Sequence, residues 1–320
     1  MKIKQEFLKG INYWPINKAM YWWRNFDSRE VERDFAQLAK YELKTVRIFL
    51  SWEDFQPHPD LIAGTALSSL RITADLAKEH GLKIIPTFFC GHMSGVNWMP
   101  SWMLAPSSGI GRFPVFSLGS YQPAAIKNFY IEPEIIEAQL LQIQQVCSVL
   151  KGHEAVFAYD LGNESSNCCL PPHREAARTW LEKMSSAIRY HGGNAAVTLG
   201  MHAEDLEEDR QLWPQDAALY CDFLSMHAYP FYHSWAYDNL DINILLLMGA
   251  VTAWLGKKAV LLGEFGLPTR PLLPPYPSED YENLKCPLWD ETVAADYYRE
   301  TLQFLQEVRM IGALAWCFAD

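Results

Sequence analysis

Two glutamates in this 320-residue chain each lie at the end of an apolar run that is typical of a buried strand. Glu164 follows the run AVFAYDLGN, and Glu264 is part of AVLLGEFG. A carboxylate in such a place costs free energy unless partners or a chemical task compensate for it. Two carboxylates that face each other across a site can hydrolyse a glycosidic bond, one as the acid and the other as the nucleophile. We therefore expect glycoside hydrolysis from this pair.

The two carboxyl groups are expected to differ in pKa. Arg47 lies inside the apolar run TVRIFLSW, and a buried guanidinium could hold one carboxylate ionised. The other carboxyl must be protonated near neutral pH to donate to a leaving oxygen. We assign Glu264 to the first role, as the nucleophile, and Glu164 to the second, as an acid with a raised pKa. A separation of about 5–5.5 Å would retain the anomeric configuration, and one of about 6.5–9.5 Å would invert it.

Polar and aromatic residues near other strand ends could bind a sugar. Tyr229 could donate a hydrogen bond to the nucleophile, and Asn163 could hold the sugar 2-hydroxyl. Trp316 offers a flat face beneath a pyranose ring. Trp52 lies at a strand end and Trp98 in a long loop, where a purely structural Trp is less expected. These residues predict a neutral carbohydrate as the ligand.

Structural interpretations of the same residues stay open. Glu164 could be a carboxylate favoured by the dipole at a helix N-terminus, although the preceding Asn163 and the matching GEFG segment favour a site. Arg47 could belong to a structural ion pair, but a buried Arg needs a carboxylate and the catalytic candidates are at hand. The adjacent Cys168 and Cys169 could have a redox role, with packing in a loop favoured.

Three histidines near strand ends raise the question of a metal. His92, His202 and His227 could be satisfied core groups or, together with Asp205, metal ligands. Hydrolytic metal barrels usually show a close His-x-His or a bridging carboxylate, and the chain has neither spacing. We therefore expect no metal, and a metal site is kept only as a minor alternative.

The elements that must position these residues alternate along the chain, because short apolar runs recur between segments of helical period. We expect eight strands at 7–14, 45–52, 82–90, 155–162, 195–201, 223–229, 259–266 and 311–318. We expect seven helices at 29–42, 68–81, 133–152, 175–192, 210–220, 240–256 and 291–309. This pattern predicts an α/β fold, a (β/α)8 TIM barrel that occupies residues 1–320 as one domain.

Two features modify the predicted barrel. The eighth helix is missing, since the last expected strand is followed almost at once by Asp320. A longer natural chain, a partner or an irregular loop could fill that gap. Long loops are expected at 91–132 and 267–290, both on the C-terminal face of the barrel, where the chemistry of this fold takes place.

Composition narrows the partners. With 38 acidic and 27 basic residues the net charge is -11, and no stretch gathers Lys and Arg into a face, so we expect no nucleic acid. The apolar run 242–256 is too short to span a bilayer and is expected to be a buried helix, so no membrane contact is predicted. The N-terminus lacks the pattern of a signal peptide, and the seven cysteines suggest no disulfide framework. We expect a cytoplasmic protein; its oligomeric state is left open.

Taken in chain order, these residues resemble the pattern of the clan A retaining glycoside hydrolases, and within the clan family 5, which includes cellulases and β-mannanases. The family has an Arg on strand 2, a His after strand 3, an Asn-Glu pair at strand 4, a His-x-Tyr at strand 6, a Glu at strand 7 and a Trp at strand 8. The matching residues here are Arg47, His92, Asn163, Glu164, His227, Tyr229, Glu264 and Trp316. The resemblance implies that Glu164 is the acid/base, that Glu264 is the nucleophile and that no cofactor is needed.

The hypothesis is a cytoplasmic retaining β-glycosidase that cleaves β-linked manno- or gluco-configured oligosaccharides by double displacement. The segment GHMSGVNWMPSW resembles the third loop of family members active on β-mannosides. Alternatives are an endo-acting β-1,4-mannanase or β-1,4-glucanase on polysaccharide, a carbohydrate-binding barrel without turnover, and a metal-dependent barrel hydrolase or isomerase.

Overall fold

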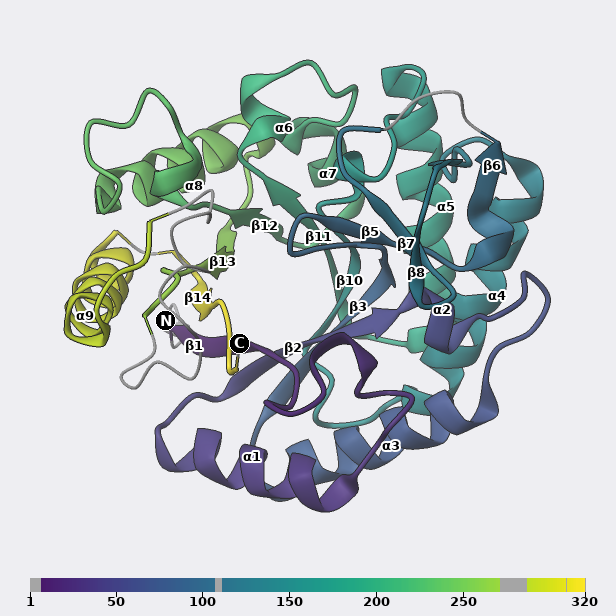
Figure 1. Cartoon of the computed structure of the whole chain (residues 1–320), viewed down its shortest axis with the longest axis horizontal. Coiled ribbons are helices and arrows are strands. Elements are labelled where there is room, and N and C mark those ends of the chain that lie inside the picture. The colour runs from purple at the N-terminus through teal and green to yellow at the C-terminus, as the bar shows by residue number, and fades with distance from the viewer. Residues whose placement is uncertain (1–6, 107–110, 271–286, 309, 320) are drawn as a thin grey trace.

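Eight parallel strands close into a barrel in the computed structural model, which describes residues 7–106, 111–270, 287–308 and 310–319 (Figure 1). The strands are β1 (Leu8–Tyr13), β2 (Thr45–Ser51), β3 (Lys83–Cys90), β10 (Ala158–Asn163), β11 (Ala196–His202), β12 (Leu224–His227), β13 (Val260–Phe265) and β14 (Gly312–Ala315). Neighbours in the barrel are neighbours in this series, and β1 pairs with both β2 and β14. The predicted (β/α)8 barrel and all eight strands are confirmed.

A ring of helices covers the outside of the barrel (Figure 1). The long helices are α1 (Ser28–Lys40), α3 (Gly64–Glu79), α4 (Pro133–Leu150), α5 (Arg174–Gly192), α7 (Pro214–Tyr220), α8 (Ile242–Gly256) and α9 (Glu291–Glu307). They match the seven predicted helices. The helix expected at 210–220 begins only at Pro214, because Trp213 is its N-cap and Asp216 accepts a hydrogen bond from the Trp213 backbone N–H.

Short elements complete the described chain. Near strand ends they are η1 (Ala19–Tyr21), α2 (Trp52–Phe55), η3 (Ser165–Asn167), α6 (Glu204–Glu207) and η4 (Pro230–Tyr232). Within the expected loop 91–132 they are β4 (His92–Met93), β5 (Val96–Trp98), η2 (Ser101–Met103), β6 (Leu104–Pro106), β7 (Val115–Ser117), β8 (Ser120–Gln122) and β9 (Ala124–Ile126).

The loop after β3 is therefore not irregular. Strands β4, β5, β7 and β8 form a small sheet, and β6 pairs with β9. Such short strands lack the apolar periodicity on which strand prediction depends, so the sequence pattern did not reveal them. Of the other predicted loop, 267–290, residues 271–286 lie outside the described residues, as does position 309 of the last predicted helix.

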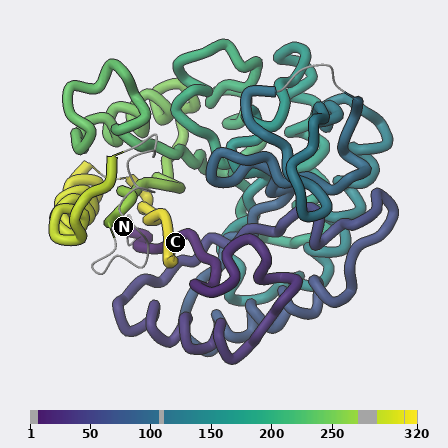
Figure 2. Tube along the Cα trace, viewed as in Figure 1, coloured from purple at the N-terminus to yellow at the C-terminus, as the bar shows by residue number. Residues whose placement is uncertain are grey.

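The barrel interior changes character along its axis. A small apolar cluster joins Ile85 of β3, Ala158 of β10, Leu261 of β13 and Leu314 of β14 with Phe223. Residues from strands on opposite sides of a closed barrel can meet only through its interior, so this cluster fills one end. Charged side chains occupy the other end, at the carboxyl ends of the strands. Figure 2 shows how the trace returns to its start, with β14 beside β1.

No helix among the described residues combines the length and the apolar character that crossing a membrane requires. Helix α8 was expected to be buried, and here the structure differs. Leu247 is 48% exposed and Trp254 68% exposed, so one face of α8 is open to solvent while the other packs on the barrel.

Candidate active site

Arg47 lies at the centre of the charged end of the barrel and contacts four side chains from three other strands, β1, β10 and β13. Its guanidinium donates to Asp160 Oδ2 at 2.8 Å, to Glu264 Oε1 at 2.7 Å, to Asn163 Oδ1 at 2.8 Å and to Asn12 Oδ1 at 3.2 Å. Only 1% of Arg47 is exposed. A buried guanidinium of this kind holds the planes of its partners in place, because its donors form a rigid fork.

Asp160 is the partner that the sequence interpretation missed. The catalytic carboxylates were expected to pair with Arg47, yet Asp160 forms the second ion pair, at 2.7 Å. Its other hydrogen bonds come from the Thr87 hydroxyl at 3.1 Å and from the Gly200 backbone N–H at 2.8 Å. The signal was present, since Asp160 interrupts an apolar strand just as Arg47 does. Arg47 therefore forms a structural ion pair with Asp160 and also binds the catalytic candidate Glu264.

Glu264 at the end of β13 is 4% exposed and is held by two donors. Arg47 binds Oε1, and the Tyr229 hydroxyl donates to Oε2 at 2.9 Å, which is the hydrogen bond expected from the sequence. His227 Nδ1 lies 3.4 Å from Oε1. Burial raises the pKa of Glu264, and the charge of Glu164 adds to this, against the lowering effects of His227, Arg47 and Tyr229.

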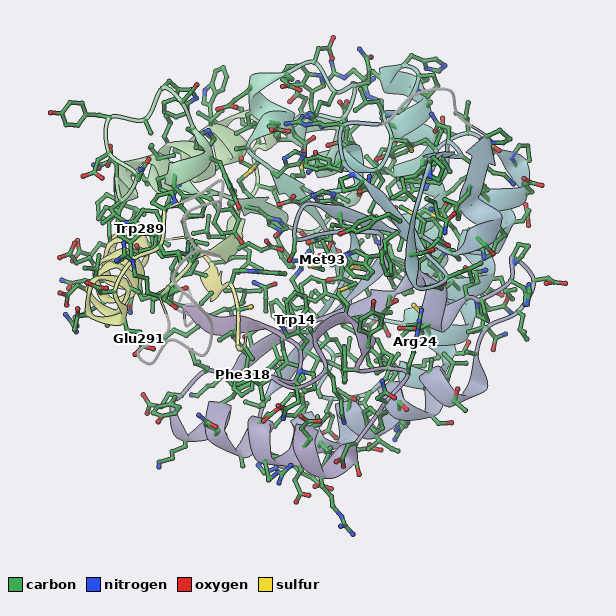
Figure 3. The ribbon with its side chains drawn as sticks, viewed as in Figure 1. Trp14, Arg24, Met93, Trp289, Glu291 and Phe318 are labelled. Carbon is green, nitrogen blue, oxygen red and sulfur yellow. The ribbon has the colours of Figure 1, made fainter. Side chains whose placement is uncertain are left out.

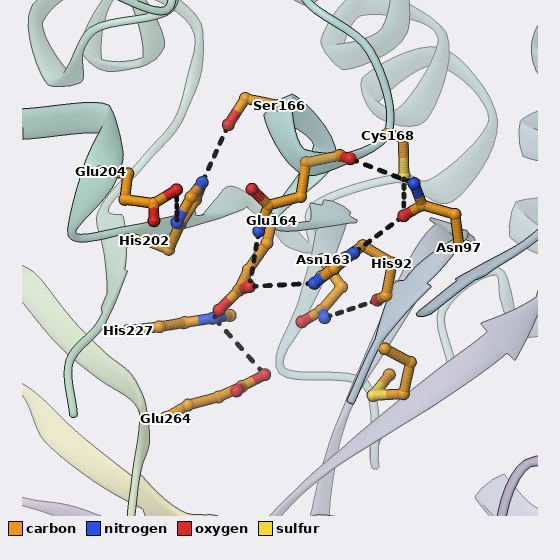
Figure 4. Close-up of polar contacts among 12 residues, drawn as sticks. His92, Asn97, Asn163, Glu164, Ser166, Cys168, His202, Glu204, His227 and Glu264 are labelled. Carbon is orange, nitrogen blue, oxygen red and sulfur yellow. Dashed lines mark hydrogen bonds and ion pairs between the residues drawn. The ribbon is translucent and has the colours of Figure 1, made fainter. Parts of the chain in front are cut away.

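Glu164 follows β10 with a left-handed backbone, φ 47°, and its N–H donates to the Gly200 carbonyl at 2.9 Å. Such a conformation is rare for a residue with a side chain and is concentrated at functional sites. The side chain faces donors: His227 Nδ1 lies 2.9 Å from Oε1, Asn167 donates to Oε2 at 3.1 Å, and His92 Nε2 lies 3.9 Å from Oε2 (Figure 4).

The pKa directions are the reverse of those expected from the sequence. Burial raises the pKa of Glu164, but the His227 hydrogen bond and the charges of His202, His227 and His92 outweigh it and leave the pKa well below its usual range. Arg47 lowers the pKa of Glu264, as expected, but does not outweigh burial. The expectation of a raised pKa for Glu164 is wrong. Its physical reason is that the three imidazoles come from three different strands or loops and cannot be placed near Glu164 from sequence spacing.

The two carboxylates are close together. An oxygen of Glu164, a nitrogen of His227 and an oxygen of Glu264 all lie within 4.8 Å of one another. These three residues form the one group with potential metal-ligand geometry among the described residues. The geometry does not favour a cation there, because the Arg47 guanidinium already occupies one side of Glu264. The metal ligands considered from the sequence, His92, His202, His227 and Asp205, do not form such a group in the described part of the chain.

Asn163 and His92 support the pair rather than standing free. The Asn163 amide donates to the His92 carbonyl at 2.9 Å and accepts from Arg47. His92 Nδ1 lies 2.8 Å from Asn97 Oδ1, and its ring packs 4.4 Å from Phe113. Burial lowers the pKa of His92. Sugar binding by Asn163 stays a prediction.

The three candidate tryptophans differ. Trp316 after β14 is partly exposed and meets the Trp14 and Phe49 rings edge-on, at 5.1 and 5.7 Å. Trp14 lies near the centre of the barrel mouth in Figure 3, whereas Trp289 lies at its periphery. Trp98 on β5 is half-buried and packs on Phe116 at 4.6 Å. Trp316 and Trp98 stay candidates for sugar binding.

The prediction that Trp52 binds a sugar is wrong. Trp52 is fully buried, donates to Gln56 and packs against Trp102 and Phe89, so it has no face for a ligand in this structure. Trp52 is the first residue of α2, and its ring packs among Phe89, Trp102 and Phe129, which its sequence position at a strand end could not show.

The adjacent cysteines pack in a loop. Burial raises the pKa of Cys169 to about 12 and that of Cys168 well above its ordinary value. A thiol in this state is a poor nucleophile, because the thiolate is the reactive form. Packing is the interpretation that the structure favours over a redox role.

Comparison with known proteins supports the fold. No protein family model and no curated protein sequence matched the chain. A variant of GH5_18 from Streptomyces cattleya, in complex with Manβ1-4GlcNAc, superposes with a TM-score of 0.78 and 19% identity, over 98% of this chain and 71% of that one. The exo-β-1,4-mannosidase Op5Man5 from Opitutaceae bacterium strain TAV5 superposes with a TM-score of 0.76 and 25% identity. The match covers 97% of this chain and 52% of the mannosidase.

An endo-1,4-β-mannanase from Rhizomucor miehei superposes less well, with a TM-score of 0.65 and 15% identity, over 97% of this chain and 86% of that one. All three neighbours are glycoside hydrolases by name or family. The chain shares its fold with glycoside hydrolases of family 5, and the resemblance that the sequence motifs indicate is confirmed at that level.

Proposed function

We propose that this chain is a retaining β-glycoside hydrolase that removes β-linked mannosyl residues, with Glu264 as nucleophile and Glu164 as acid/base. The observation that carries the proposal is that one oxygen of Glu164 lies within 4.8 Å of one oxygen of Glu264. Retaining glycosidases keep their carboxyl groups about 5–5.5 Å apart, whereas inverting enzymes need about 6.5–9.5 Å to admit a water between carboxylate and sugar. The pair therefore fits direct attack by a carboxylate.

In the first step Glu264 attacks the anomeric carbon. Arg47 and the Tyr229 hydroxyl orient its two oxygens, and Tyr229 can follow the charge as the ester forms. Glu164 donates a proton to the leaving oxygen. A bound sugar excludes water from Glu164 and so favours the protonated form, against the effect of the imidazoles.

In the second step Glu164 takes a proton from water, the water oxygen bonds to the anomeric carbon, and the ester bond to Glu264 breaks. A lowered pKa suits Glu164 for this step, because a carboxylate that is ionised in its surroundings is ready to act as the base.

The preference for mannosyl substrates rests on the neighbours, since an exo-β-1,4-mannosidase and a protein bound to Manβ1-4GlcNAc superpose more closely than the endo-mannanase. Exo action has separate support from the loop after β3. Its Arg112 forms ion pairs with Glu204 of α6 and with Glu208, and Phe113 packs on His92. These contacts join the loop to α6 across β10. They would prevent a long polysaccharide from extending through that side of the barrel mouth.

A substrate panel tests the proposal. We expect turnover of 4-nitrophenyl β-mannoside and of Manβ1-4GlcNAc, little activity on the β-glucoside and β-xyloside, and slow release of mannose alone from mannan. Proton NMR should show β-mannose as the first product. The α-anomer as first product would exclude the retaining mechanism, and rapid release of long oligosaccharides from mannan or glucan would favour the endo-acting alternative.

The remaining alternatives give other results in the same assays. A carbohydrate-binding barrel would bind sugars in calorimetry without hydrolysing any of the panel. A metal-dependent enzyme would lose its activity in chelator, whereas the two-glutamate mechanism predicts full activity. The expected cytoplasmic location stays a prediction, which fractionation of the producing cells would check.

A further inference from the structure

His202 at the end of β11 belongs to a buried polar chain behind Glu164. Its Nε2 lies 2.9 Å from the Ser166 hydroxyl, and that hydroxyl donates to Asp205 Oδ1 at 2.6 Å. Asp205 also accepts from the His202 backbone N–H at 3.0 Å. Ser166 and Asp205 are 4% and 2% exposed, so buried polar groups hold the imidazole at its Nε2 side.

The charges around His202 favour its protonated form. Burial lowers the pKa of His202, but Asp205, Glu164 and Glu204 raise it further than burial lowers it, against a smaller opposing effect of Arg112. Glu204 Oε2 lies 3.8 Å from His202 Nδ1, and Figure 4 shows the ring between Glu204 and Glu164. The imidazole thus lies between carboxylates that favour its protonated form.

The groups that face Glu164 and its neighbourhood come from several elements. From β10 and η3 they are Asn163, Ser166 and Asn167; from β11 and α6, His202, Glu204 and Asp205; from the loop after β3, His92 and Arg112; from β12 and β13, His227 and Glu264; and beyond α6, Glu208 and Arg210. Arg210 pairs at 2.5 Å with Glu204 and at 2.9 Å with Glu208, so its charge is already balanced.

We propose that His202, fixed by Ser166 and Asp205, is a positioning residue that places a positive charge beside the carboxylate of Glu164 and so keeps Glu164 ionised, and able to act as the base, at lower pH. In this proposal His202 acts through Glu164 alone, since its side-chain polar contacts are with Ser166, Glu204 and Asp205. The inference rests on the proposed function. It differs from the role of His227, which contacts both carboxylates directly.

The test is the pH dependence of deglycosylation in the variant His202→Gln. With 2,4-dinitrophenyl β-mannoside the first step needs no acid, so kcat reports the second step, which requires ionised Glu164. Loss of the charge at position 202 should move the acidic limb of the kcat profile upward by at least about 0.5 pH unit. The control His58→Gln changes an exposed histidine and should leave the limb in place.

Ser166→Ala provides the second variant, because it keeps the imidazole but removes the hydroxyl that fixes it. We expect a smaller upward movement of the same limb, and this variant decides the question if His202→Gln does not fold. A lower kcat at every pH with an unmoved limb, or a limb that moves downward, would overturn the proposal and leave His202 with a packing role.

A wild-type protein without turnover on any panel substrate would refute the proposed function but not this inference. The carbon-13 resonance of the Glu164 carboxyl, assigned by its loss in Glu164→Gln, can be titrated without substrate. It should titrate at higher pH in His202→Gln than in wild type, and equal titration would overturn the inference independently of activity.

Discussion

The two carboxylates at the barrel mouth differ in their surroundings. Glu264 accepts hydrogen bonds from a guanidinium and a phenol, neither of which changes its protonation near neutral pH, and only one imidazole, that of His227, lies close to it. Glu164 is surrounded by imidazoles, the side chains that do titrate there. Its side chain is 16% exposed, against 5% for Glu264.

This difference matches the two tasks proposed for them. A nucleophile must keep one orientation through the reaction, and Arg47, anchored by Asp160, provides it. A proton donor and acceptor must respond to what is bound, and a cluster of titratable neighbours allows that. The partners that hold a carboxylate therefore distinguish its role better than its pKa, whose direction here is the reverse of the one expected from the sequence.

The largest expected effect is on kcat/KM, and its dependence on the leaving group distinguishes the roles of the two carboxylates. Glu264→Gln should lose about 10⁴-fold or more in kcat/KM on every substrate, because no nucleophile remains. Glu164→Gln should lose about 10²–10⁴-fold on Manβ1-4GlcNAc, whose leaving group needs a proton, but far less in the first step with a dinitrophenyl glycoside. Steady-state and burst kinetics measure both. Equal losses on both substrates in the two variants would contradict the assigned roles.

The next effect concerns the support of Glu264. Arg47→Lys removes the rigid fork that joins Glu264 to Asp160 and should lower the free energy of unfolding by about 3 kcal/mol, with a fall in kcat. Urea denaturation and kinetics give the two values. Arg29→Lys, at an exposed position on α1, is the matched control and should change neither. An unaltered stability in Arg47→Lys would mean that the network does not hold the site.

A smaller effect on stability is expected from adding a methyl group at Gly200, which packs against Arg47 and His227. A Cβ on Gly200 would lie 2.7 Å from an Arg47 nitrogen and from the Gly162 carbonyl oxygen, both buried. Gly200→Ala should therefore cost about 1–3 kcal/mol of stability. Gly64→Ala, where a Cβ would meet nothing within 4 Å, is the control. Thermal unfolding of the two variants should differ, and identical curves would show that the site can relax.

The smallest effect is in stability against pH. The lowered pKa of Glu164 means that its ionised form stabilises the fold above the unfolded pKa of about 4.3 and that this contribution fades as the pH falls below that value. Wild type should thus lose up to about 1.4 kcal/mol of stability per pH unit more than Glu164→Gln between about pH 4 and 3.

The raised pKa of Glu264 has the opposite effect on stability, because its ionised form destabilises the fold. Glu264→Gln should therefore gain stability relative to wild type as the pH rises above about 4.3. Urea titrations at several pH values check both signs.

Much of the fold could be predicted because its elements are long and periodic. The apolar strands and the helices between them follow the pattern that a barrel buried on both faces of its sheet demands. The small sheet of β4, β5, β7 and β8 was missed, since strands of two or three residues carry no period. The exposed face of α8 was missed because its sequence is apolar all round.

The candidate site divides in the same way. Glu164, Tyr229 and Glu264 are at strand ends, where the topology alone predicts their convergence. The structure brings them together with Arg47, which lies inside β2. Asp160 and the chain from His202 to Asp205 were not predicted as a network, and Trp52 was assigned a role that its burial excludes. These errors concern side-chain direction, which a strand position does not specify.

By itself the sequence determined the barrel, the order of its strands and the residue types at its mouth, because hydrophobic period and turn chemistry are local properties of the chain. Only the tertiary structure decided which of those residues touch. Arg47 and Asp160 are 113 positions apart, and Arg47 and Glu264 are 217 apart. The charge of each catalytic candidate depends on such partners, since Coulomb energies and burial depend on distance in space and not along the chain.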